Sequence, residues 1–152
     1  MPEFGTYGIN FPFSESRLGY MFDLTDTPEE EIRANLIHLL LTRKGMRYFL
    51  PDYGTRLYEY IFEPLDTITF DSIEAEIREQ VQKYIPNLRI DSIIITPLAE
   101  AEEGEGTLVS DNDDRVFRVA GAGTDDYTAK VRIDFTTTSS AFETKDFVTI
   151  NL

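Results

Sequence analysis

The sequence predicts an α+β fold in which helices come first and a small, mostly antiparallel β-sheet follows in the C-terminal half. Apolar residues recur every three or four positions between residues 28 and 84, whereas they alternate at every second position in the C-terminal stretches. A chain of 152 residues also fits one domain that can bury a core without disulfides, and it contains no cysteine. We expect a single domain with an arm at 1–26, a core at 28–97, an acidic loop at 98–114 and strands at 115–152.

The first 26 residues are rich in aromatic side chains and glycine but show little periodicity. We interpret them as an extended arm anchored by its rings, laid either across its own domain or onto a partner. Residues 1–24 lack the basic start and the apolar run of a signal peptide. The apolar runs of the chain are also too short to span a bilayer, so we expect synthesis in the cytosol.

An amphipathic helix is predicted from residue 28 to residue 44. Thr27 supplies an N-cap, Pro28 suits the first helical position and Glu30 completes a capping box. The polar side of this helix includes His38, the only histidine, which we expect to face solvent. Thr42-Arg43-Lys44-Gly45 ends the helix, because cations favour its negative end and glycine accepts a positive φ.

A rigid turn is predicted next, at Pro51-Asp52-Tyr53-Gly54. Proline fixes φ, aspartate can bond to nearby backbone and glycine can turn left-handed, so this connection should hold one shape. Such rigidity favours a docking surface over a flexible linker. The basic residues around it suggest docking onto an acidic protein surface, but they are equally well explained as a solvated helix end with counter-charges. They are Arg33, Arg43, Lys44, Arg47 and Arg56.

Two more helices are predicted after this turn. A short one at 56–62 should end at Glu63-Pro64, because the residue before a proline avoids the helical region. A longer one follows with an apolar face, and Pro86 stops it. Polar residues that include Glu76 cover the rest of this helix, and we expect the helix to lie on a sheet.

Strands make up the remainder of the prediction. The stretch at 88–97 is rich in β-branched residues, and Ile93 to Ile95 suggest burial on both faces. Residues 98–114 are acidic and predict a mobile loop or a hairpin tip. Further strands are expected at 115–120, 127–135 and 147–152, with breaks at 121–123 and 136–140. The middle strand has an apolar face for the helices and a polar face for water or a partner.

The block at 32–97 resembles the baseplate wedge and sheath-initiator proteins of contractile phage tails, which have relatives in type VI secretion baseplates. An ordered series carries this resemblance: a helix, Thr42-Arg43-Lys44-Gly45, Pro51-Asp52-Tyr53-Gly54, a short segment reading L-x-x-x-I-F-E, a second helix and a strand. The family usually has Glu-Pro-Arg after the long helix, whereas this chain has Ile85-Pro86-Asn87. The resemblance therefore does not imply a contact through that Glu and Arg.

The resemblance implies a structural protein of the virion tail baseplate, made in the host cytoplasm and present in several copies in a symmetric assembly. Its implied partners are the tail sheath protein and other wedge proteins, with the tail tube or hub as a further candidate. In the family, the first sheath ring docks by donating strands to the terminal sheet, which is β-augmentation. Candidate interface residues are Arg43, Lys44, Gly45, Arg47, Pro51, Asp52, Tyr53, Gly54, Pro86, Asn87, Tyr127, Val131, Ile133, Phe135, Phe147, Ile150 and Leu152.

Charge argues against two classes of partner. The chain has 14 basic and 28 acidic residues, and its net charge of −14 repels phosphate backbones and anionic lipid. We therefore expect no nucleic acid and no membrane among the partners.

Enzymatic chemistry finds little support in the residues. Members of the resembled family have been described as lysozyme-like, and a glycosidase needs two carboxylates across a cleft. Asp52 and Glu63 already have structural roles, and no tryptophan offers a sugar platform. The run Asp111 to Asp114 lacks the glycine and the glutamate that a calcium loop requires. We predict no catalytic residue, cofactor or metal ligand, and keep a peptidoglycan hydrolase and a small adaptor as the alternatives.

Overall fold

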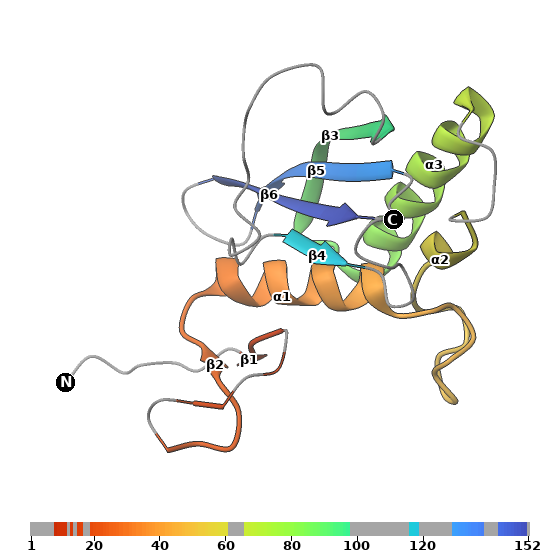
Figure 1. The fold of residues 1–152 in the computed structure, drawn as a ribbon. Helices are drawn as coiled ribbons and strands as arrows, with labels where there is room; N and C mark the ends of the chain where they lie inside the picture. Colours follow the sequence, from red (N-terminus) through yellow and green to blue (C-terminus); the bar gives the residue numbers. More distant parts are fainter. Residues whose placement is uncertain are drawn as a thin grey trace.

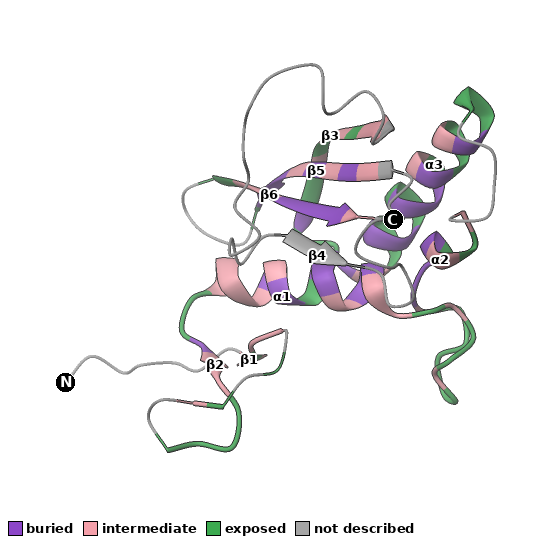
Figure 2. Cartoon of the chain, in the orientation of Figure 1, coloured by how far each residue is buried: buried purple, intermediate pink, exposed green. Residues whose placement is uncertain are grey.

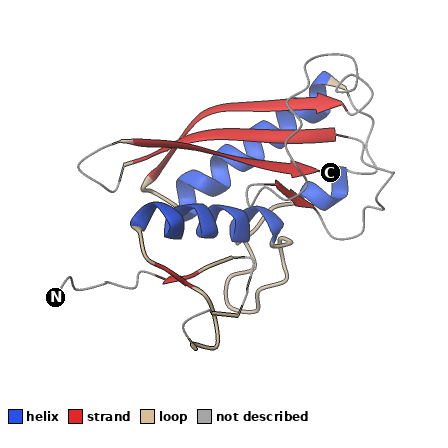
Figure 3. Ribbon diagram, turned by 60° about the vertical axis from the view of Figure 1, so that its left-hand side comes forward, coloured by secondary structure: helices blue, strands red, loops and turns tan. Residues whose placement is uncertain are grey.

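The computed structural model describes residues 8–11, 13, 15–16, 19–60, 66–97, 116–118, 129–138 and 143–151. Within them, two main helices and a short one pack on a four-stranded sheet (Figure 1). The predicted α+β class is confirmed. Turning the molecule shows the long strands side by side with α3 behind them (Figure 3). No helix in the described part of the chain is both long and apolar enough to cross a membrane.

Helix α1 spans Pro28–Leu41 and begins as predicted. The Thr27 hydroxyl accepts a hydrogen bond from the Glu30 backbone N–H at 3.3 Å, and the Glu30 carboxylate accepts one from the Asp26 N–H at 3.2 Å. The helix ends at Leu41, earlier than the predicted residue 44, because Thr42 is already extended (φ −78°, ψ 124°). Its backbone is engaged by a later segment, as described below.

Two helices follow the first. Helix α2 spans Leu57–Tyr60, inside the predicted 56–62, and residues 61–65 lie outside the described part of the chain. Helix α3 spans Thr67–Tyr84. Asp66 caps it by accepting a hydrogen bond from the Thr69 backbone N–H at 2.8 Å, and this bond lowers the pKa of the Asp66 carboxyl.

The main sheet has the strand order β3-β5-β6-β4. Neighbours β3 and β5, and β5 and β6, are antiparallel, whereas β4 runs parallel to β6. Some of the predicted segments lie outside the described residues. They are the loop at 98–114 and the ends of the predicted strands at 115, 119–120, 127–128 and 152. The strands are β3 at Leu88–Pro97, β4 at Val116–Arg118, β5 at Ala129–Thr137 and β6 at Thr144–Asn151.

Alternation along β5 places one face of the sheet in the core. Val131, Ile133 and Phe135 are fully buried against the helices, as are Val148 and Ile150 of β6 (Figure 2). Arg132 and Asp134 lie on the opposite face and pair with each other at 3.1 Å. The predicted division into an apolar and a polar face is therefore confirmed for the described part of β5.

Two details of the sheet differ from the sequence prediction. The stretch from Ile93 to Ile95 was expected to be buried on both faces of the sheet. Ile94, however, lies on the polar face, is paired with Arg132 in the register and is 50% exposed, because the described elements cover only one side of the sheet. Thr136 and Thr137 were expected in a link between strands, but they are buried in β5. The Thr136 hydroxyl donates a hydrogen bond to the Asp91 carboxylate, so this buried hydroxyl has a hydrogen-bond partner.

The arm contains a second, two-stranded sheet. Strand β1 at Gly8–Ile9 pairs antiparallel with β2 at Leu24–Thr25. Both strands contact α1, and the arm lies below that helix in Figure 1. The described part of the arm is thus laid on its own domain, which was one of the two arrangements that the sequence left open.

A buried carboxylate attaches α2 to α3. Glu76 was predicted to lie on the polar side of α3, yet it is only 7% exposed, because it accepts hydrogen bonds from the segment that crosses α3. Its Oε1 atom accepts from the Arg56 backbone N–H at 3.2 Å and from the Arg56 Nε at 3.3 Å. The Tyr60 hydroxyl donates to Oε2 at 3.4 Å.

Replacing Glu76 with alanine should therefore destabilise the fold. Because the substitution removes three hydrogen bonds at a buried site, we expect the free energy of unfolding to fall by about 2 kcal/mol in urea denaturation. Glu74→Ala is the matched control, since its pair with Arg78 at 2.8 Å is exposed and should contribute about 0.5 kcal/mol or less. Equal losses in the two variants would contradict this assignment.

Candidate functional site

The segment from Thr42 to Thr55, here called the elbow loop, is closed by backbone hydrogen bonds. The Thr55 N–H donates to the Thr42 carbonyl at 2.9 Å, and the Lys44 N–H donates to the Thr55 carbonyl at 3.0 Å. Further out, the Gly45 N–H donates to the Pro51 carbonyl at 2.8 Å. Arg43 and Thr55 form a parallel β-bridge. The loop therefore has one shape, in agreement with the rigid turn that its proline and glycine predict.

Two glycines permit this closure. Gly45 and Gly54 have φ values of +89° and +105°. A Cβ atom at Gly54 would lie 2.3 Å from the Thr42 carbonyl oxygen, whereas one at Gly45 would meet nothing within 4 Å. Gly54 is thus required both for its backbone conformation and for the close approach of two chain segments.

Helix α3 holds the inner side of the elbow loop. Gln80 is buried, and in the amide orientation that satisfies both its atoms it donates to the carbonyls of Asp52 and Gly54, each at 3.1 Å. Lys83 Nζ lies 3.8 Å from the Asp52 carboxylate. Sequence reasoning missed Gln80, although its position between Ile77 and Val81 on the apolar face was a usable signal.

Two basic side chains of the elbow loop, those of Arg43 and Arg47, are turned toward rings of the protein itself. The Arg47 guanidinium stacks on the Tyr53 ring with 3.9 Å to the ring centre, and its Nη2 atom is 3.2 Å from His38 Nδ1. Arg43 lies over the Tyr58 ring at 4.7 Å. These contacts are cation–π interactions and a hydrogen bond within one chain.

His38 is half-buried rather than facing solvent as predicted. The elbow loop reaches it through Arg47 and through the Tyr53 hydroxyl, 3.3 Å from Nδ1, while the Phe11 ring of the arm lies 5.3 Å away. Burial, with a smaller contribution from the Arg47 charge, lowers the pKa of His38. Burial also raises the pKa of the Tyr53 hydroxyl. The prediction failed because the periodicity of a helix does not show what packs against it: the arm is remote in sequence, and the elbow loop turns back to contact the helix that it follows.

Aromatic rings form a continuous row from the arm to α3. Consecutive ring centres are between 5.0 and 6.0 Å apart, a separation typical of edge-on and tilted aromatic contacts. The row thus joins the arm, α1, the elbow loop and α3. Its members in order are Phe22, Phe13, Phe11, His38, Tyr53 and Tyr84.

The elbow loop and the turn after α3 meet at one pocket of about 300 Å³. Three predicted interface residues, Tyr53, Pro86 and Asn87, line it, and Glu31 and Asn35 of α1 supply its polar wall. The structure therefore brings the two predicted docking segments together, although Ile85-Pro86-Asn87 replaces the charged triplet of the family.

The predicted interface residues of the C-terminal strands are placed differently. Val131, Ile133, Phe135 and Ile150 point into the chain's own core, while Phe147 lies on the polar face of the sheet beneath Arg132, at 4.4 Å. Tyr127 and Leu152 lie outside the described residues. Both edges of β5 are occupied, by β3 and β6.

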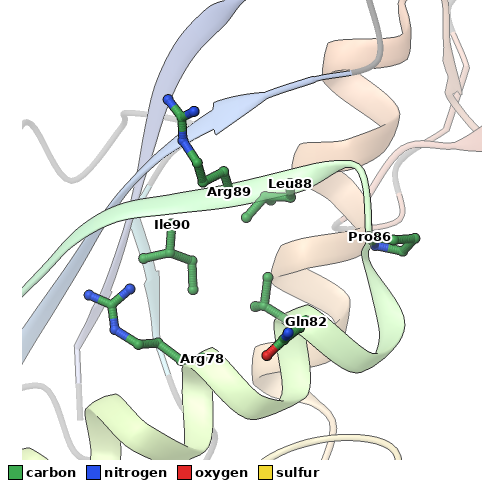
Figure 4. A pocket seen from close by; sticks show the side chains of 7 residues that line it. Arg78, Gln82, Pro86, Leu88, Arg89 and Ile90 are labelled. Atoms are coloured by element: carbon green, nitrogen blue, oxygen red, sulfur yellow. The ribbon is translucent and has the colours of Figure 1, made fainter.

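Strand β3 forms one edge of the sheet. Among the described strands only β5 pairs with it, so its outer edge is unpaired there along Leu88–Pro97. A pocket of about 380 Å³ opens between this strand and α3. Figure 4 shows Leu88 and Ile90 of β3 facing α3, with Arg78 and Arg89 at the pocket's borders.

The outer end of the elbow loop is apolar and exposed. Tyr48 is 100% exposed and Phe49 is 97% exposed, and Met46 and Leu50 beside them are also exposed. Figure 2 shows this loop projecting from the body between α1 and α2. Sequence reasoning missed these residues. A usable signal was the run from Met46 to Leu50, which lies between the turn glycines Gly45 and Gly54 and contains no acidic residue.

Nothing in the described part of the chain resembles a metal centre, because no group of three or more His, Asp or Glu side chains is arranged to hold an ion there. Three surface features of the described residues are candidates for contact with another protein. They are the elbow loop, the pocket beside it and the edge of β3.

A family model described as baseplate wedge protein gp25 matches residues 26–111, which is more than half of the chain. The chain belongs to this family. The gp25 match covers α1, the elbow loop, α2, α3 and β3, which are the elements that carry the resemblance in the sequence.

One relative is the baseplate wedge protein gp25 of Enterobacteria phage T4. The two proteins are 36% identical over 64 residues, which are 42% of this chain and 47% of the T4 protein. The chain thus spans about half the length of that relative.

Two solved structures share the fold of this gp25 family member. One is described as a putative tail lysozyme from Geobacter sulfurreducens, with a TM-score of 0.56, 20% identity and coverage of 83% of this chain and 92% of that chain. The other is a chain of the anti-feeding prophage baseplate, with a TM-score of 0.54, 16% identity and coverage of 96% and 84%. At these identities the likeness concerns the fold alone.

Substituting Gly54 should open the elbow loop. In Gly54→Ala the new Cβ would collide with the Thr42 carbonyl and oppose the positive φ, so we expect a loss of at least about 3 kcal/mol in unfolding free energy. Gly45→Ala is the matched control, because it has a similar φ without a collision and should cost about 1–2 kcal/mol. If the two variants unfolded at the same denaturant concentration, the close approach would not matter.

The burial of His38 should make stability depend on pH. Because its folded pKa is below the ordinary 6.5, the unfolded chain binds more protons, so stability falls as pH drops below about 6.5. We expect urea denaturation at about pH 7.5 and again at about pH 5.5 to show a larger loss of unfolding free energy for the wild type than for His38→Gln. Parallel pH profiles in the two proteins would show that His38 titrates freely.

Proposed function

We propose that this protein is a structural component of the baseplate wedge of a contractile tail, and that it templates the first ring of the sheath. The observation that supports the proposal most directly is the gp25 family match across residues 26–111. A baseplate chain of the anti-feeding prophage has the same fold over 96% of this chain. In this proposal the protein acts by complementarity of shape and backbone, and several copies occupy a symmetric baseplate.

The elbow loop and the adjoining pocket form the proposed wedge-facing surface. Its backbone is fixed by hydrogen bonds and by Gln80, so little conformational entropy is lost when a partner binds. The pocket lined by Tyr53, Pro86 and Asn87 offers a concave partner site beside it. The neighbours proposed for this surface are other wedge proteins, with the tail tube or hub as a further candidate.

The edge of β3 is the proposed site for a strand of the sheath protein. An unpaired edge presents backbone N–H and C=O groups that an incoming strand can satisfy. Its length, Leu88–Pro97, gives ten residues for pairing, and the pocket bordered by Arg78 and Ile90 can receive alternate side chains of the added strand. Strand β5 is not a candidate, since both of its edges are already paired.

We do not extend the proposal to peptidoglycan hydrolysis. That chemistry needs a carboxyl group with a raised pKa opposite a second carboxylate. Asp66 and Asp91 have lowered pKa values, because backbone and hydroxyl groups donate hydrogen bonds to them. Asp52 lies beside Lys83 and is exposed. The putative tail lysozyme from Geobacter sulfurreducens resembles this chain in fold only.

A lysine on the edge strand tests the strand-addition proposal. Ile94 is half exposed on β3, so Ile94→Lys should leave the fold intact while an edge lysine opposes pairing with a new strand. We expect particles made with this variant and the neighbouring tail proteins to have baseplates without sheath in electron micrographs. Ile68→Lys, at a 76% exposed position on α3, is the control and should give sheathed tails.

Normal sheath growth with Ile94→Lys would contradict strand addition at β3 and would leave the wedge assignment standing. Absence of the wild-type protein from purified tail particles would overturn the wedge assignment itself. Truncation of β6 is not a clean test, because Val148 and Ile150 belong to the core.

A further inference from the structure

The outer end of the elbow loop, Met46-Arg47-Tyr48-Phe49-Leu50, reverses the usual arrangement of a surface loop. Its charged residue is turned inward, with Arg47 stacked on Tyr53 and bonded to His38. Its apolar residues are turned outward, and the rings of Tyr48 and Phe49 are almost completely exposed. We call these five residues the loop tip. Two adjacent exposed rings on a projecting loop are uncommon in a soluble protein unless another surface covers them.

The loop tip is held in position before any partner arrives. At its base, the Gly45 N–H donates to the Pro51 carbonyl at 2.8 Å, and the Met46 N–H donates to the Arg43 carbonyl at 3.2 Å. Within the tip, the Leu50 N–H donates to the Arg47 carbonyl at 3.3 Å, and just beyond it the Tyr53 N–H donates to the Leu50 carbonyl at 3.0 Å. These turns direct the side chains outward. Such preorganisation lowers the entropic cost of binding.

Charge around the loop tip indicates the chemistry of what covers it. The elbow loop carries Arg43, Lys44 and Arg47, and its one acidic residue, Asp52, lies beside Lys83 at 3.8 Å. The positive charge of this region contrasts with the net charge of −14 of the whole chain. A covering surface should therefore be apolar at its centre and acidic at its edge.

We propose that the loop tip is an anchor that inserts Tyr48 and Phe49 into an apolar pocket rimmed by carboxylates on another wedge protein. This inference rests on the proposed function, since it names the contact by which the elbow loop docks. Aromatic side chains that fill a partner's pocket carry most of the energy of many interfaces, while surrounding charges guide the approach. The apolar tip supplies affinity, and the basic residues around it supply orientation.

Two other occupants fit the observations less well. A second copy of this chain would bring a net charge of −14 spread over the whole molecule, whereas the proposed partner needs carboxylates only at the rim of one pocket, so association of two copies is the less favourable contact. An anionic membrane is repelled by the same net charge. Both remain measurable outcomes of the test below, as self-association and as vesicle binding.

The test uses a double variant, Tyr48→Ala with Phe49→Ala, in the full-length protein. The wild type is first purified with the tail proteins encoded beside it, and the wedge protein that copurifies is then titrated against each variant by calorimetry. We expect the double variant to bind about 30-fold or more weakly, the loss typical of two anchor residues. Its thermal unfolding midpoint should match that of the wild type, because both side chains are exposed.

Matched controls separate a specific anchor from general loss of apolar surface. Met21→Ala with Ile68→Ala removes two apolar side chains that are 81% and 76% exposed elsewhere, and it should bind within about twofold of the wild type. Lys44→Glu should slow association and weaken its salt dependence, because the tip would meet the acidic rim with less positive charge.

Three results would overturn the inference. One is equal binding by the wild type and the Tyr48/Phe49 double variant, which would leave the wedge function intact. Another is an equal loss of binding in the Met21/Ile68 control. The third is a change confined to self-association, or to binding of vesicles of phosphatidylcholine and phosphatidylglycerol. A wild-type protein that copurifies with no tail protein would instead overturn the proposed function together with the anchor.

Discussion

The fold around the proposed docking surface depends on one close approach, between the backbone of Gly54 and the carbonyl of Thr42. It ends α1, because the Thr42 carbonyl accepts its hydrogen bond from Thr55 instead of continuing the helix. It also sets where α2 begins and presents the Asp52 and Gly54 carbonyls to Gln80. Three helices are thus positioned by a crossing that leaves no space for a side chain. The docking surface is rigid for the same reason.

Features set by local physical chemistry could be predicted from the sequence. The start of α1 followed from Thr27, Pro28 and Glu30, because an N-cap acts over four residues. The closed elbow loop followed from Pro51 and Gly54, because proline fixes its own φ and glycine permits a positive φ. A period of about 3.6 identified α3 and a period of 2 identified β5, since those patterns reflect burial of one face, while β-branched content identified β3.

Features set by contacts between remote segments could not be predicted in this way. Glu76 and His38 occupy polar positions on their helices, and only the packing of α2, the arm and the elbow loop makes them buried or half-buried. Strand β5 is paired on both sides because of the order of the four strands, and the alternation of residues along one strand carries no information on that order. For the same reason the sequence could place candidate interface residues at Tyr53, Pro86 and Asn87, which line one pocket, but could not show that the apolar face of β5 is buried in the chain's own core.

The order β3-β5-β6-β4 has a consequence for how the protein folds during its synthesis. Helices α1 and α3 can form from local contacts, but the sheet surface that covers them is completed by β5 and β6, which come from the last part of this sequence. The Arg33–Asp146 pair, which joins α1 to β6 at 3.1 Å, forms only at that stage. The apolar faces of both helices are therefore only partly covered on the nascent chain, by each other and by β3, until β6 has emerged, and a chaperone that binds such faces has its longest opportunity in that interval.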